Sequence, residues 1–87
     1  MPRFIVIHTL TFSEADFRVA AKDMPAMFPA GVSWNKTYCD FADKKFICEW
    51  EAPDRKALEE VFGMIQMPFD TIYPVKIFNV ATIEFEA

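Results

Sequence analysis

The stretch WNKTYCDFADKKFICEW, from Trp34 to Trp50, contains both tryptophans and both cysteines of this 87-residue chain. Two runs rich in aromatic and β-branched residues flank the short segment 42–44. Such runs joined by a short connection are typical of a β-hairpin. We therefore predict strands over residues 32–41 and 45–51, connected by a turn whose length the sequence leaves open.

Side chains alternate between the two faces of a strand, so the predicted hairpin has two faces of different character. One face carries Cys39, Phe46, Cys48 and Trp50, and we expect it to face the core. The opposite face carries Trp34, Lys36, Tyr38, Ile47, Glu49 and Glu51. With the shorter turn, Lys36 lies opposite Glu49, which is a favourable cross-strand pair.

Amphipathic periodicity predicts one helix before the hairpin and one after it. The first helix begins after Ser13, a good N-cap residue, and stops or kinks at Pro25. The second begins after Asp54, another good N-cap residue. Their apolar stripes are Phe17, Ala20, Ala21 and Met24 in the first helix and Ala57, Leu58, Val61, Phe62 and Ile65 in the second.

Further strands are predicted over residues 3–11 and 71–80, followed by a short, half-buried tail strand over residues 81–87 that pairs within its own subunit or with a partner. The order β-α-β-β-α-β corresponds to the ferredoxin-like plait, an antiparallel sheet with two helices on one face. We therefore predict a single α+β domain over residues 1–87 with this βαββαβ plait and a short extra C-terminal strand.

The apolar content predicts a second subunit. Hydrophobic residues make up 53% of the chain and aromatic residues 16%, with only two glycines, which is more apolar surface than a small domain readily hides. In the first strand, Phe4, Val6 and Leu10 share one face with His8, whereas Ile5 and Ile7 occupy the other. The helix-free sheet face is therefore expected to pack on a second copy, which makes a homodimer of the dimeric α+β barrel type.

Charge and hydropathy narrow the range of partners. A net charge of −4 without any basic run disfavours nucleic-acid binding. No apolar stretch reaches the ~20 residues of a membrane span, and the N-terminus has no signal-peptide pattern. We therefore expect a cytoplasmic protein that binds neither nucleic acid nor membrane, and whose cysteines are thiols.

Candidate site residues come from two groups. His8 is the only histidine of the chain, so it is the only imidazole that can act as an acid, a base or a metal ligand, or else it packs in the sheet with a hydrogen bond. Cys48 is a candidate metal ligand beside His8, for example for zinc, or a buried core residue. Trp34, Tyr38 and Glu49 are candidate ligand-binding residues, and the aromatic pair alternatively anchors the dimer interface.

Residues 32–77 resemble a family of small ferredoxin-like proteins of unknown function, some of which are described as nickel-binding. The shared features are Trp34, Thr37-Tyr38, Asp43-Lys44, Cys48, Glu51-Ala52-Pro53, Pro68, Asp70 and Val75. The resemblance implies a ferredoxin-like fold and nickel as a possible ion. The chain departs from the family at Val61, where relatives commonly have histidine, and at Gln66, where they usually have glycine.

Two functions from different classes follow. The first is a homodimeric binding protein that holds a small ligand, or a nickel or zinc ion, near the cleft between sheet and helices. The alternative is a cofactor-independent monooxygenase or isomerase of the dimeric α+β barrel type, which rests on fold analogy alone and assigns no catalytic residue. A third reading is an interaction module without a working pocket.

Overall fold

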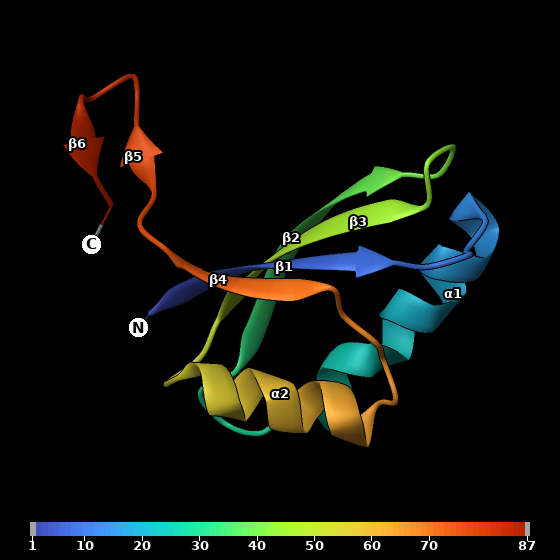
Figure 1. Cartoon of the computed structure of the whole chain (residues 1–87). Coiled ribbons are helices and arrows are strands. Elements are labelled where there is room, and N and C mark those ends of the chain that lie inside the picture. The colour runs from blue at the N-terminus through green and yellow to red at the C-terminus, as the bar shows by residue number, and fades with distance from the viewer. Residues whose placement is uncertain (1, 87) are drawn as a thin grey trace.

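The computed structural model describes residues 2–86 and has the predicted order of elements (Figure 1). Ala87, the last residue of the predicted tail strand, lies outside the described residues. The elements are β1 (Arg3–Thr9), α1 (Glu14–Asp23), the 3-10 helix η1 (Met24–Met27), β2 (Ser33–Asp40), β3 (Lys45–Glu51), α2 (Arg55–Met64), β4 (Thr71–Val75), β5 (Phe78–Asn79) and β6 (Glu84–Phe85).

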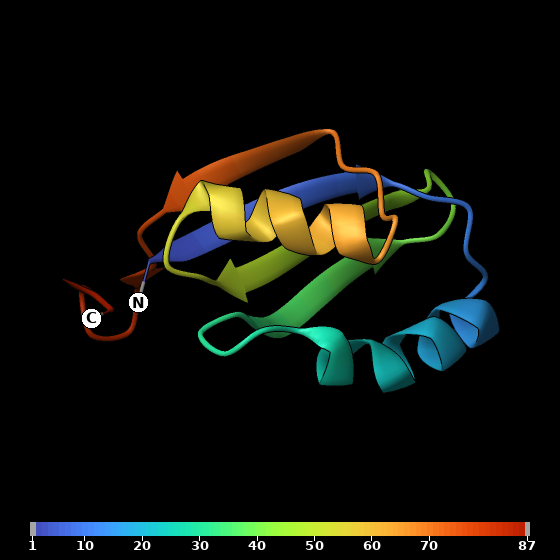
Figure 2. The ribbon, with the colours of Figure 1, turned by 90° about the horizontal axis from the view of Figure 1, so that it is seen from below.

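The four long strands form one sheet in the order β2-β3-β1-β4, and every neighbouring pair is antiparallel. Both helices cover the same face of this sheet (Figure 2). The opposite side, which we call the open face, carries no helix (Figure 1). This arrangement confirms the predicted α+β ferredoxin-like plait.

Both predicted helix caps are present. The Ser13 hydroxyl accepts a hydrogen bond from the Asp16 amide at 3.1 Å, and the Asp54 carboxylate accepts one from the Ala57 amide at 2.8 Å. These bonds satisfy amides in the first turn, which have no partner within their own helix. At the other end of α1, Pro25 lies within η1, so the chain tightens into a 3-10 turn there. In the described residues, neither helix is long and apolar enough to cross a membrane.

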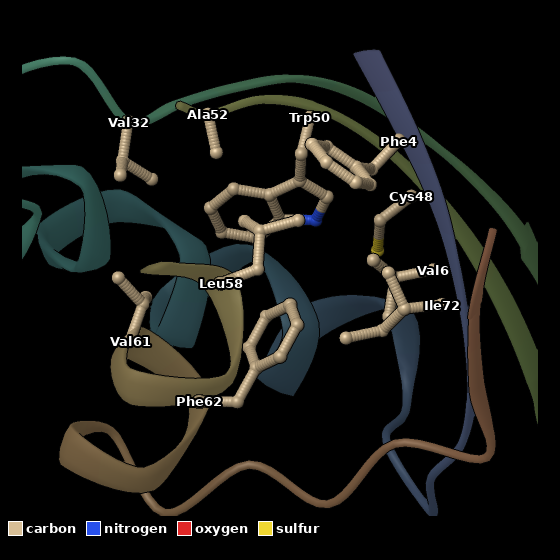
Figure 3. Packing of buried hydrophobic residues seen from close by; sticks show 10 residues of the cluster. All are labelled: Phe4, Val6, Val32, Cys48, Trp50, Ala52, Leu58, Val61, Phe62 and Ile72. Carbon is tan, nitrogen blue, oxygen red and sulfur yellow. The ribbon is translucent and has the colours of Figure 1, made fainter. Parts of the chain in front are cut away.

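The core lies between the sheet and α2 rather than evenly beneath both helices (Figure 3). Its buried members are Phe4, Val6, Val32, Cys48, Trp50, Ala52, Leu58, Val61, Phe62 and Ile72. Three of these residues come from α2, whereas α1 has no fully buried residue. The predicted stripe of α1 does face inward, but its side chains are only partly covered. The α1 side of the molecule is therefore less tightly packed than the α2 side.

The hairpin contains one irregularity that the sequence pattern did not reveal. Lys36 pairs with Glu49 as predicted, yet Trp34 pairs with Trp50, so β2 has one extra residue, Asn35, at a β-bulge. A bulge residue inverts the side-chain parity of everything before it. The prediction that Trp34 lies on the same face as Tyr38 is therefore wrong. Trp34 points toward the helices and stacks on Trp50, with ring centroids 5.9 Å apart.

The C-terminal region also departs from the prediction. The expected strand over residues 71–80 ends at Val75, and β5 then pairs with β6 in a separate two-stranded sheet. Ile83, within the predicted half-buried tail strand over residues 81–87, instead lies in the connecting turn and is exposed. The reason is that residues 80–83 reverse the chain direction, so the tail folds back on residues 78–79.

Candidate functional site

His8 points toward the helices, an orientation that the sequence left open. It is fully buried, and its ring meets the edge of Phe62 on α2, with centroids 5.2 Å apart. Its Nδ1 lies 2.7 Å from the carbonyl oxygen of Pro68. A carbonyl oxygen can only accept a hydrogen bond, so Nδ1 carries the proton and donates the hydrogen bond. In the neutral ring this leaves Nε2 as an acceptor with a free lone pair.

Two buried ring nitrogens at this place lack hydrogen-bond partners. These are His8 Nε2 and Trp50 Nε1, one an acceptor and the other a donor. Burial lowers the pKa of His8, although the Pro68 carbonyl and the charge of Asp70 act in the opposite direction. The imidazole is therefore neutral at pH 7, in keeping with an Nε2 that accepts rather than donates.

A small cavity between the sheet and α1 adjoins these groups. Its volume of about 20 Å³ is room for about one water molecule. The residues that line it are His8, Leu10, Phe12, Phe17, Ala20, Ala21, Met24, Trp34, Phe46, Cys48, Trp50 and Met67. Its wall is almost entirely apolar, so the few polar atoms that reach it would dominate the orientation of anything bound there.

Cys48 belongs to the same cavity and is part of a short hydrogen-bond chain. The Trp34 indole N–H donates to the Thr37 hydroxyl at 2.7 Å, and that hydroxyl lies 3.2 Å from the Cys48 sulfur and donates to it. Burial raises the pKa of the Cys48 thiol, and the hydrogen bond from the Thr37 hydroxyl offsets this only in part. The side chain is therefore a neutral thiol at pH 7, which is a poor nucleophile and a poor metal ligand.

The predicted ligand-binding residues do not come together. Trp34 lines the helix-side cavity, whereas Tyr38 and Glu49 project from the open face on the other side of the sheet. Tyr38 is 62% exposed. Glu49 is buried, and its carboxylate accepts a hydrogen bond from the Asn35 side-chain amide at 3.1 Å and pairs with Arg3 at 3.6 Å. The bulge at Asn35 thus separates Trp34 from Tyr38 and holds Glu49 in place.

The candidate metal ligands His8 and Cys48 do line one cavity, but without further ligands. Within residues 2–86, no group of three histidine, cysteine, aspartate or glutamate side chains is placed to hold a metal ion. Val61, which stands where relatives commonly have histidine, is a core residue and does not line this cavity. His8 and Cys48 alone therefore do not make a complete nickel or zinc site, since structural zinc usually takes four ligands.

Gln66, the second position at which the chain departs from the family that it resembles, has a left-handed backbone conformation with φ of 55°. Glycine adopts this conformation without a steric cost, which is the physical reason for the glycine that the resemblance implies at this position.

Several residues of the cavity were not identified from the sequence. Phe12, Phe17 and Met24 supply much of the apolar wall, and the Pro68 carbonyl sets the tautomer of His8. The helical stripe predicted that two of these side chains face inward but not that they border a cavity. A main-chain carbonyl leaves no signal in the sequence at all.

Comparison with known proteins agrees with the fold and the resemblance. The chain is similar, over residues 4–75, to the family described as nickel responsive protein SCO4226-like. Its fold is similar to the crystal structure of SCO4226 from Streptomyces coelicolor A3(2), with a TM-score of 0.74, 20% identity, and coverage of 84% of this chain and 94% of that chain. No curated protein matches the chain. Because the family match spans most of its length, the chain belongs to the SCO4226-like family of nickel responsive proteins.

Proposed function

We propose that this protein binds a small, mostly apolar molecule in the cavity between the sheet and α1. The ligand would carry one hydroxyl or N–H group that donates a hydrogen bond to His8 Nε2. The observation that carries this proposal is the free acceptor itself, fully buried at the wall of an apolar cavity. A buried polar atom without a partner costs about 1–3 kcal/mol, which a donor on the ligand would recover.

Entry of a ligand larger than water requires α1 to move. The cavity of about 20 Å³ admits no ring, but α1 is only loosely held on the sheet, because none of its residues is fully buried. Its main anchor is Phe17, whose ring stacks on Phe46 with centroids 5.2 Å apart. Elements with little buried surface open at low free-energy cost, so a modest outward shift of α1 would enlarge the cavity.

A matched pair of probes tests the role of His8. Phenol and toluene have similar shapes, but only phenol can donate a hydrogen bond. We expect the ratio of phenol affinity to toluene affinity to be about tenfold higher in the wild type than in His8→Leu, because one hydrogen bond to a buried acceptor contributes roughly 1–1.5 kcal/mol. NMR titration, followed at the aromatic resonances of Phe17 and Phe46, measures both affinities.

The control for this titration is Tyr38→Phe, which removes a hydroxyl on the other side of the sheet and should leave the ratio unchanged. An equal ratio in wild type and His8→Leu would contradict the proposal. So would the absence of any saturable shift at the cavity resonances with either probe.

A metal ion is the second candidate, and it is favoured by the family description and by the presence of His8 and Cys48 at one cavity. With two protein ligands, one of them a thiol whose pKa is raised by burial, we expect weak binding. After incubation with Ni²⁺ and dialysis, the protein should retain well below one nickel ion per chain by elemental analysis. A full equivalent that disappears in His8→Leu would favour a metal site over the small-molecule site.

The proposed working form is a homodimer in which the open faces of two copies meet. Its support is the row of apolar side chains on this face, among which Tyr38 and Tyr73 are more than half exposed and Ile47 is also exposed. Large apolar side chains grouped on one sheet face are typical of an interface.

A further inference from the structure

Residues 76–86, which contain β5 and β6, form a projection that we call the C-terminal arm. The arm pairs with no strand of the main sheet. It rises from the end of β4 on the side of the sheet opposite α2 (Figure 1). Its base is closed by a hydrogen bond from the Glu86 amide to the Ile77 carbonyl at 2.8 Å and by an ion pair between Arg3 and Glu86 at 3.4 Å. The family match ends at residue 75, just before the arm begins.

The surface of the arm is unusually apolar for an exposed hairpin. Val80 is 76% exposed, Ile83 68% and Phe85 64%. The only aromatic contact within the arm is that of Phe78 with Phe85, whose ring centroids lie 5.0 Å apart. A two-stranded hairpin of this size is marginally stable by itself in water. The arm therefore has the composition of a segment that packs against another surface.

The turn of the arm carries backbone strain that its own protomer does not explain. Ile83 has φ of 55°, a left-handed conformation that is rare for a β-branched residue. Asn79 supports the turn by accepting hydrogen bonds from the amides of Ala81 and Thr82. Strain of this kind usually persists where surrounding contacts compensate for it. An exposed isoleucine at such a position gains nothing within the single chain, which points to a contact outside it.

We infer that the C-terminal arm docks on the open face of a second copy, in a two-fold dimer in which each arm reaches the other subunit. This inference rests on the homodimer proposed above, and it does not depend on the ligand cavity. The arm and the open face are two apolar surfaces of one chain, and neither has a cover. Because the arm rises on the open-face side, a second sheet packed on that face would lie beside it. In a two-fold dimer, this contact forms twice.

The arm does not cover its own open face. Within the arm only Lys76 and Ile77 separate β5 from the end of β4, and the ion pair from Arg3 to Glu86 holds the base of the arm at the end of the sheet. The large apolar side chains that remain exposed on the open face are Tyr38, Ile47 and Tyr73, and Lys36, Asp40 and Lys45 are exposed beside them. The second copy is thus the partner whose surface matches the arm in chemistry and in position.

Two matched substitutions test the docking of the arm. Val80→Asp places a carboxylate on the arm, and Val19→Asp places one on α1 at a valine that is equally exposed, 73% against 76%. Neither residue is buried in the protomer, so both variants should fold as the wild type does. By sedimentation equilibrium, the wild type and Val19→Asp should have twice the 10.1 kDa mass of one chain. Val80→Asp should raise the dimer dissociation constant at least about 100-fold, because an unpaired carboxylate would be buried.

A mixing experiment shows whether the arm meets the open face. Ile47→Asp should also give monomers, because it places a charge on the open face. In a mixed dimer of Val80→Asp and Ile47→Asp, the arm of the Ile47→Asp chain and the open face of the Val80→Asp chain are both unchanged. One of the two contacts between arm and face is therefore intact. We therefore expect the mixture to recover dimers that neither variant forms alone.

Three results would overturn the inference. The first is a wild-type protein that remains monomeric, which also removes the homodimer but leaves the phenol titration as an independent test of the cavity. The second is a Val80→Asp variant that dimerises like the wild type. The third is a mixture of the two variants that stays monomeric.

Discussion

Replacing Trp50 with alanine is expected to lower the free energy of unfolding by about 3–5 kcal/mol. Trp50 is 1% exposed and is the largest fully buried side chain in the described residues. It stacks on Trp34 and meets the edge of Phe62, with ring centroids 5.9 and 5.2 Å away. Because small domains have only about 5–15 kcal/mol of stability, this loss should remove a large fraction of the total. Urea denaturation followed by circular dichroism measures it.

The control for this prediction is Val19→Ala, since Val19 is exposed on α1 and its truncation should change stability by less than about 0.5 kcal/mol. A second variant, Trp50→Phe, keeps an aromatic ring and removes an N–H that has no partner. It should cost clearly less than Trp50→Ala. A loss below about 1.5 kcal/mol for Trp50→Ala would show that the core is not organised around this ring.

Acidification below pH 6.5 is expected to destabilise the protein through His8. Burial lowers the pKa of His8 in the folded state below the value of 6.5 that it has when solvated. Above pH 6.5 the imidazole is neutral in both states and has no effect on stability. As the pH falls below 6.5, the unfolded state takes up a proton and the folded state does not, so stability decreases. The free energy of unfolding falls by at most about 1.4 kcal/mol per pH unit. The decrease stops once the pH is below the pKa of His8 in the folded state.

Urea denaturation at several pH values between 6.5 and 5 checks this dependence. His8 is the only histidine, so no other side chain has an ordinary pKa near this window. The His8→Leu variant should therefore have a nearly flat profile there. A wild-type profile as flat as that of His8→Leu would contradict a buried neutral imidazole. The Asp70 carboxyl, whose pKa is lowered mainly by the Thr9 hydroxyl, acts only at lower pH.

Much of the fold was predictable because it depends on short-range patterns. Ser13 and Asp54 marked the helix starts correctly, since an N-cap bond joins residues three apart. The parity of β3 was also predicted correctly, which placed Cys48 and Trp50 in the core. The prediction for β2 was wrong at one position, because no local sequence pattern marks Asn35 as a bulge residue.

The candidate site was less predictable than the fold. His8 shares its face with Phe4 and Val6, and this grouping was evident from alternation alone. Alternation does not say which face the helices cover, so the direction of the imidazole stayed open. The prediction that Trp34 lies on the same face as Tyr38 and Glu49 was wrong, because the extra residue Asn35 moved the indole to the other face.

The amino-acid sequence by itself determined the order of the elements, the helix caps and the α+β plait, because periodicity and capping act between residues a few positions apart. Only the tertiary structure decided that His8 Nε2 and Trp50 Nε1 are buried without partners, and that the C-terminal arm stands apart from the sheet. These features depend on contacts between segments distant in sequence, such as that of His8 with the Pro68 carbonyl. Long-range contacts decide which buried polar atoms have hydrogen-bond partners. The proposed ligand site depends on one that has none, His8 Nε2.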